Sequence, residues 1–263
     1  MGEAWALYRT LVSATVKARA TYRWNFAVSL VLGMVMLSAE LLVVLYIANR
    51  VHGIGGWTAS QILVLVGFAQ TASGLYRVFA SELHEFDRYL VGGEFDSILT
   101  RPASPLFILA TRSLNPEQAG WIAEGIVVLA VGIWRSGAWR TPGIAVAGSG
   151  VGLLAGGAIF FALVTATAAI GFWTTRIDDI QPLLLYGPET AANYPLSVYP
   201  RGIQALFFTI IPVALGSYLP ACVVLGKGPS WYLLISAGGS IVAVLLALAL
   251  WNMGVRHYTS TGS

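Results

Sequence analysis

Six long apolar stretches alternate with more polar segments along the chain. The stretches cover residues 26–48, 62–79, 118–134, 144–173, 203–225 and 231–251. A helix needs about 20 mainly apolar residues to cross the hydrocarbon core of a bilayer. The pattern therefore predicts an all-α polytopic membrane protein with six transmembrane helices, forming a single transmembrane domain over residues 1–263.

The fourth stretch, residues 144–173, is longer than one upright span requires. We expect it to tilt or to project beyond the bilayer. It carries glycine at every fourth position, at Gly148, Gly152 and Gly156. Such a stripe lets another helix backbone approach closely. The pattern leaves open whether the neighbouring helix belongs to this chain or to a second subunit.

Residues 1–24 alternate apolar and basic positions with a helical period. Leu7, Leu11 and Tyr22 fall on one side, and Arg9 and Lys17 fall on another. A helix of this type lies in the membrane interface, with its cations toward the lipid headgroups. This predicts an N-terminal interfacial amphipathic helix that contacts membrane lipids.

The segment 80–117 is the most charged part of the chain. Within it, Leu83, Phe86 and Leu90 share one helical face, and Gly92 and Gly93 predict the end of that helix. A short helix with one apolar face suits docking into the groove of a partner protein. The alternative is a solvated loop with a single helical turn.

Four residues within the predicted spans are candidates for a translocation path. Glu40 is an acid deep in an apolar stretch, where a carboxylate is costly and by default suggests a functional site. Gln70 is polar within the second stretch, and Pro212 and Pro220 are expected to kink the fifth. Each can also be explained by helix packing alone.

Composition and charge restrict the function classes. Apolar residues make up 57% of the chain and charged residues only 10%, against roughly 25% in soluble domains. With a net charge of only +3, this excludes a disordered chain, a nucleic-acid binder and a soluble enzyme. If both termini are cytoplasmic, all 15 lysines and arginines lie inside except Arg50, Arg135, Arg140 and Lys227. That bias predicts this orientation.

The sequence lacks the motifs of the common catalytic and metal sites. There is no GxxxxGK[ST] phosphate-binding loop, no HExxH and no GxSxG. His52, His84 and His257 lie in three separate segments, and Cys222 is the single cysteine. We therefore expect no catalytic residue, metal or cofactor in this chain.

Two blocks of sequence resemble one family. The first is GEFDSILTRPASPLF, from Gly93 onward, and the second is NYPLSVYPRGIQALFFTIIPVALGSYLPACVVLG, from Asn193 onward. Both are similar to the six-span permease subunits of bacterial type-2 ABC exporters, which are often encoded as pairs of permeases beside one ATPase. The resemblance covers most of the chain.

The resemblance implies a permease that acts as a dimer of identical or paralogous chains in the bacterial cytoplasmic membrane. Separate ABC ATPase subunits would hold ATP and Mg and would hydrolyse the ATP. The exported compounds would be drugs, toxic organic compounds or natural products, as in multidrug efflux. The loop after the second span would couple to the ATPase, with these candidate residues: Leu83, Phe86, Asp87, Leu90, Gly93, Asp96, Arg101 and Pro102.

Two other function classes remain as alternatives. A secondary transporter driven by an ion gradient often contains internal repeats, and no half-length repeat is visible here. An integral membrane enzyme that modifies lipids needs a cluster of reactive side chains near one interface, and the histidines are scattered. We therefore expect alternating access driven by ATP, in which ATP must favour one of two permease conformations.

Overall fold

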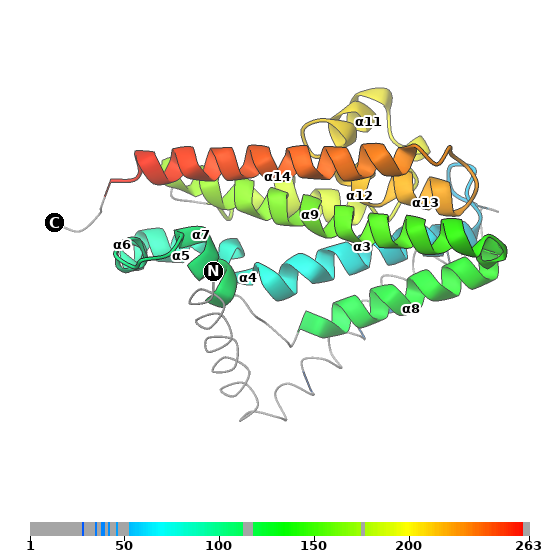
Figure 1. The fold of residues 1–263 in the computed structure, drawn as a ribbon, viewed down its shortest axis with the longest axis horizontal. Coiled ribbons are helices and arrows are strands. Elements are labelled where there is room, and N and C mark those ends of the chain that lie inside the picture. The colour runs from blue at the N-terminus through cyan, green and yellow to red at the C-terminus, as the bar shows by residue number, and fades with distance from the viewer. Residues whose placement is uncertain are drawn as a thin grey trace.

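The computed structural model describes residues 53–112, 118–174 and 177–259, and six further helical residues: Val28, Val35, Ser38, Ala39, Leu42 and Tyr46. Four of its helices are long and apolar enough to cross a membrane: α3 (Ala59–Phe79), α8 (Ala119–Ser136), α9 (Pro142–Thr174) and α14 (Tyr232–His257). α3 packs against α8 on one side and α9 on the other, and α14 packs on α9 (Figure 1). The described part contains no strand, which confirms an all-α polytopic fold.

Local sequence signals place the helix ends. The Thr58 backbone N–H donates to Gln61 Oε1 at 3.1 Å and so satisfies one donor at the start of α3. α8 ends at Gly137, whose φ of 78° is the left-handed conformation common after a helix. The 3₁₀ helix η2 (Ala138–Arg140) then turns the chain, and Pro142 opens α9 at a position where its missing N–H costs nothing.

Glycines bring α3 and α8 into backbone contact. A Cβ at Gly125 of α8 would lie 2.5 Å from the backbone nitrogen of Thr71 in α3. Three more glycines meet the opposite helix in the same way: Gly67, Gly74 and Gly132. Within each helix the two are seven residues apart, so they lie on one face. Close approach of this kind increases dispersion contacts where lipid offers no hydrophobic driving force between helices.

The glycine stripe of α9 also packs inside this chain. A Cβ at Gly148 would meet Val224, and one at Gly156 would meet Ala72 and the backbone of Gly216. Gly152 faces the ring of Phe68 and Pro220. The sequence left open whether the stripe packs within this chain or against a second subunit, and in the structure it packs within this chain.

Residues 81–112, which we call the short-helix segment, lie beside the C-terminal ends of α9 and α14 (Figure 1). The segment contains α4 (Ser81–His84), α5 (Phe86–Val91), α6 (Glu94–Leu99) and α7 (Pro105–Arg112). Gly92 and Gly93 separate α5 from α6, and Gly93 has a φ of 69°, as the sequence predicts for a helix end. The expected single helix before Gly92 is instead broken at Glu85.

An aromatic cluster holds the short-helix segment in place. The Phe86 ring lies 5.0 Å from Trp251, 5.1 Å from Phe172 and 5.2 Å from Phe95, centroid to centroid. Tyr258 packs edge-on against Phe95 at 5.0 Å. Buried aromatic pairs in these geometries are favourable beyond their area alone. The cluster therefore fixes α5 and α6 to the ends of α9 and α14.

This burial corrects the predicted docking face. Leu83, Phe86 and Leu90 do share one side, but they are 0%, 0% and 3% exposed. The apolar face that the sequence assigned to a partner's groove is covered by this chain's own helices. The prediction that these residues share one apolar face is confirmed, and the prediction that a partner protein covers this face is wrong.

The position of the fifth crossing also differs from the prediction. Residues 177–197, which lie between the predicted fourth and fifth spans, pass from one end of α3 to the other. We call their first part, residues 177–193, the crossing 177–193. Near the short-helix segment Gln181 Nε2 donates to the carbonyl of His84, and beyond the opposite end Ser197 Oγ donates to Gly55 O at 2.7 Å. This segment contains a π-helical turn, η3 (Pro182–Tyr186), and α10 (Gly187–Ala191), and the 3₁₀ helix η4 (Leu196–Val198) follows it.

Residues 201–224, which contain nearly all of the predicted fifth span 203–225, begin and end at the same end of the bundle. They comprise α11 (Arg201–Phe208), α12 (Val213–Gly216) and α13 (Tyr218–Val224), with a bend of 69° after α11. Ser197 bonds Gly55 before this segment, and Lys227 Nζ donates to Gly56 O at 3.3 Å after it. The segment is therefore re-entrant. The count of six crossings stays a prediction, because most of residues 26–48 and all of residues 1–24 lie outside the described residues.

The two prolines of this segment have different effects. Pro212 lies at the break between α11 and α12, as expected for a residue that cannot donate a backbone hydrogen bond. Pro220 lies in the first turn of α13, where backbone donors are unpaired in any case. The predicted kink at Pro212 is confirmed, and the one predicted at Pro220 is not found.

Replacing a contact glycine tests the packing of α3 against α8. We expect Gly125→Ala to lower the stability of the protein by about 1–3 kcal/mol, because the new methyl group overlaps the α3 backbone. The matched control is Gly150→Ala in α9, where nothing lies within 4 Å of the added Cβ. Thermal unfolding in detergent measures both. Equal melting temperatures for the two variants would contradict the close contact.

Candidate functional site

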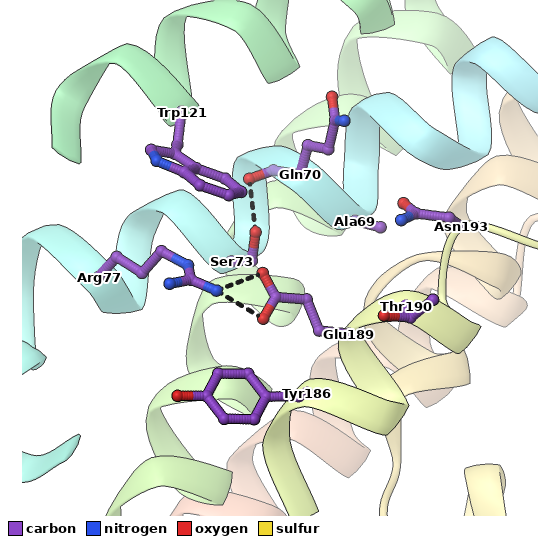
Figure 2. Close-up of a pocket in the computed structure, with 9 residues that line it drawn as sticks. All are labelled: Ala69, Gln70, Ser73, Arg77, Trp121, Tyr186, Glu189, Thr190 and Asn193. Atoms are coloured by element: carbon purple, nitrogen blue, oxygen red, sulfur yellow. Dashed lines mark hydrogen bonds and ion pairs between the residues drawn. The ribbon is translucent and has the colours of Figure 1, made fainter. Parts of the chain in front are cut away.

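Two polar helix faces meet inside the bundle. Gln70, Ser73 and Arg77 lie three or four residues apart on α3 and so share one face. The crossing 177–193 presents four polar residues with the same spacing: Tyr186, Glu189, Thr190 and Asn193. Figure 2 shows these side chains around one cavity, with Trp121 of α8 on a third side.

An ion pair joins the two faces. Arg77 Nη2 donates to both oxygens of the Glu189 carboxylate, at 2.9 and 2.8 Å (Figure 2). The side chains are 23% and 15% exposed, so water screens the pair only in part. The Arg77 guanidinium also lies 4.6 Å from the Trp121 ring centroid, a cation–π contact. The charges of Arg77 and Glu189 are thus compensated within the site.

A π-helical turn places Glu189 in this position. Pro188 has no N–H to donate to the carbonyl four residues before it, so the regular hydrogen-bond pattern is interrupted at that point. The Gly187 N–H instead donates to Pro182 O, which closes a wider turn. Such turns are rare and occur frequently at functional sites. Here the turn directly precedes the helix that carries Glu189 and Thr190.

Two cavities adjoin at Arg77. The inner cavity, of about 170 Å³, is lined by Ala69, Gln70, Ser73, Arg77, Trp121, Tyr186, Glu189, Thr190 and Asn193. The outer cavity, of about 160 Å³, lies toward the short-helix segment and is lined by Tyr76, Arg77, Ser81, His84, Glu85 and Gln118. Gln70 is near the middle of α3, about 14 Å from its C-terminal end. The two cavities together therefore reach from one end of α3 to its midpoint.

His84 connects the outer cavity to the crossing 177–193. Its Nε2 lies 2.6 Å from the hydroxyl oxygen of Tyr186, and the rings pack edge to face. Burial, and next the positive charge of Arg77, lower the pKa of the His84 imidazole below its usual range, although Glu189, Glu85 and Asp178 oppose the shift. The neutral imidazole is therefore the form that the fold favours.

Of the predicted path residues, the structure places only Gln70 at this site. Pro212 lines a separate apolar cavity between α9 and α14, and Pro220 packs against Gly152. Glu40 lies outside the described residues. Among the residues that are described, no group of three or more His, Cys, Asp or Glu side chains is arranged to hold a metal ion.

The sequence did contain a signal for the residues that were missed. Arg77 follows Gln70 and Ser73 at helical spacing, and Glu189 and Asn193 repeat that spacing in a segment taken for a loop. A polar face on each of two helices in an apolar bundle predicts that the faces meet, because lipid would leave their polar groups unpaired. Recognising the crossing 177–193 as a helix was the missing step.

A double-mutant cycle tests the ion pair. Glu189→Gln leaves the Arg77 charge without its carboxylate, so we expect a clear loss of thermal stability. Arg77→Gln with Glu189→Gln removes both charges and should lose less than the sum of the single changes. The coupling should be about 1–3 kcal/mol, from unfolding in detergent. Additive effects would mean that the two side chains do not interact.

The His84 pKa predicts a pH dependence. With the native pKa lowered, the unfolded chain binds the proton more readily once the pH falls below the ordinary histidine value of about 6.5. We expect the melting temperature to fall between about pH 7.5 and about pH 5.5. His84→Gln, which can still bond Tyr186, should show a smaller fall. A larger or equal fall in the variant would contradict the assignment.

Comparison with known proteins agrees with this architecture. The family model described as ABC-2 family transporter protein matches residues 34–262. No curated protein and no solved structure matches the chain. The match covers the whole bundle, the short-helix segment and the re-entrant segment. The chain therefore belongs to the ABC-2 family of transporter proteins and is an integral membrane permease of an ABC transporter.

Proposed function

We propose that this chain is the permease subunit of an ATP-driven exporter and that separate ATPase subunits dock on the short-helix segment. Two such chains, identical or paralogous, would enclose the translocation path, with both termini in the cytoplasm. The exported compounds would be drugs, toxic organic compounds or natural products. The family assignment supports the partnership with an ABC ATPase in general.

The position of the short-helix segment in the bundle carries its choice as the docking site. It follows α3 directly, it is fixed by the aromatic cluster to α9 and α14, and His84 contacts the crossing 177–193. A displacement imposed on this segment is therefore transmitted to four elements of the bundle. Packed interfaces of this kind switch between discrete arrangements and do not deform continuously.

The surface available to an ATPase differs from the one expected from the sequence. With Leu83, Phe86 and Leu90 buried, three large apolar side chains of the segment remain open: Val91 at 73%, Leu99 at 39% and Phe107 at 37%. Val91 and Leu99 lie close together in sequence. Arg101 and Pro102, both among the predicted coupling residues, are exposed beside them in sequence. We propose that residues 91–102 make the docking contact and that Phe86 attaches it to the bundle.

The energetic requirement is differential binding. ATP can drive the permease between inward- and outward-facing states only if the closed ATPase pair binds one state more tightly than the other. Shifting a population from 1:99 to 99:1 needs about 5.5 kcal/mol of such preference. The contact at residues 91–102 is where this preference would act on the permease.

An exposed apolar residue provides the test. We expect Val91→Asp to reduce the amount of ABC ATPase that copurifies with the tagged full-length chain by about tenfold, because a central apolar contact is worth at least about 1.4 kcal/mol. Mass spectrometry of the ATPase's phosphate-binding-loop peptide quantifies the partner.

The matched control is Val198→Asp. Val198 is 42% exposed in η4, near Gly55 at the opposite end of the bundle. It should retain the ATPase and insert into the membrane normally. Equal ATPase recovery in the two variants would overturn the proposed docking site. Leu83→Asp or Phe86→Asp would be unsuitable, because a buried charge there would disrupt the aromatic cluster itself.

A further inference from the structure

The inner cavity contains a polar side chain that nothing in the described residues satisfies. Gln70 is 4% exposed, and neither its Nε2 nor its Oε1 has a hydrogen-bond partner in the described part of the chain. Leaving a buried donor or acceptor unpaired costs about 1–3 kcal/mol. The same holds for Arg77 Nε and for Nδ1 of His84, a residue that lines the outer cavity. Unpaired atoms thus lie along both cavities.

Both cavities have room for water. About 170 and 160 Å³ are far more than the roughly 10–15 Å³ that one water needs. Both cavities are lined by Arg77, so they lie next to each other, the outer one toward the short-helix segment and the inner one beside Gln70. If the cavities held no water or solute, the Gln70 amide would have no hydrogen-bond partner in the middle of the bundle.

The charges of the site select what can bind beside Gln70. A cation would have to compete with Arg77 for Glu189, and an anion would have to compete with Glu189 for Arg77. Either one breaks the ion pair, in which Arg77 Nη2 donates to both carboxylate oxygens, and leaves a charge behind, which is strongly unfavourable in a partly buried site. A neutral group leaves the pair intact.

The other polar side chains of the lining are neutral, and their amide and hydroxyl groups can both donate and accept. Gln70 offers one amide donor side and one acceptor side, and Thr190 adds a hydroxyl. Ser73 Oγ donates to its own helix at Gln70 O, which leaves its oxygen as an acceptor. Trp121 gives one flat apolar wall. The complementary ligand group is an uncharged hydroxyl or carboxamide.

We propose that the two cavities form one hydrated path that admits the neutral hydrogen-bonding part of a transported solute to Gln70 and rejects charged groups. The use of the path in transport rests on the proposed function. Its hydration and its selectivity do not, and both can be measured without an ATPase.

Cysteine accessibility tests the path in the full-length chain. Cys222 is the single cysteine and is buried, so Cys222→Ala gives an unlabelled background. Into it we place Ser73→Cys, which conserves side-chain size. The probes are three methanethiosulfonates of similar length: neutral hydroxyethyl, cationic trimethylammonium-ethyl and anionic sulfonatoethyl. Each rate is divided by the rate of the same reagent at the exposed control Ser230→Cys, outside the proposed docking contact, which removes intrinsic reactivity.

The expected result is a normalised rate at Ser73→Cys about tenfold higher for the neutral reagent than for either charged one. The lipid-facing control is Ile241→Cys, 60% exposed on α14, which should react slowly with all three. Labelling at Ser73→Cys as slow as at Ile241→Cys would show a dry cavity and overturn the proposal. Equal rates for neutral and charged reagents would also overturn it.

Variants that remove one charge of the ion pair test whether charged reagents are excluded by charge or by the width of the path. Adding Glu189→Gln should raise the sulfonatoethyl rate at least about fivefold, and adding Arg77→Gln should do the same for the cationic reagent. The double variant Arg77→Gln with Glu189→Gln keeps the site neutral, and the preference for the neutral reagent should persist. If no single variant changes the ratio of charged rates, the ion pair does not set the selectivity and the proposal fails. ATPase copurification is read separately, so failure here leaves the docking site untouched.

Discussion

The pairing of Arg77 with Glu189 is the constraint on which the arrangement of this bundle depends. A charge placed within an apolar bundle must find a partner inside it, because the alternative is an uncompensated charge against lipid. This requirement holds the crossing 177–193 against α3, although that crossing is short and contains a π turn. Once the two helices are joined in this way, the polar face of each is turned inward, and a cavity lined by polar groups follows.

Glycine contacts determine how the rest of the bundle closes around this pair. Gly125 of α8 meets the backbone of α3 at Thr71, six residues before Arg77, so Trp121 of the same helix is brought over the guanidinium. On the other side of α3, the stripe at Gly152 and Gly156 admits Phe68 and Ala72. α3 is thus enclosed by neighbours, while α14 stays largely open to lipid or to a second chain.

The sequence was sufficient to predict the long apolar helices. It was not sufficient to predict elements whose position depends on polar contacts or on residues distant in sequence. α3, α8, α9 and α14 are recognisable because hydropathy alone defines them. The crossing 177–193 was missed because Glu189 and Asn193 lower its hydropathy, and their partners are distant in sequence. The apolar face of Leu83 and Phe86 was visible, but a helical period cannot show whether the covering helix belongs to the same chain. Gln70 was found because a lone amide in an apolar run stands out locally.

The short-helix segment and the outer cavity share residues, and this links ATPase coupling to the proposed path. Ser81, His84 and Glu85 belong to the short-helix segment and also line the outer cavity. His84 bonds Tyr186, which lines the inner cavity beside Glu189. In the proposed mechanism, a shift of the short-helix segment therefore changes the wall of the path directly, without a relay through distant helices. Since Phe86 fixes the same segment to α9 and α14, opening of the path and movement of the long helices would be coupled through one rigid element.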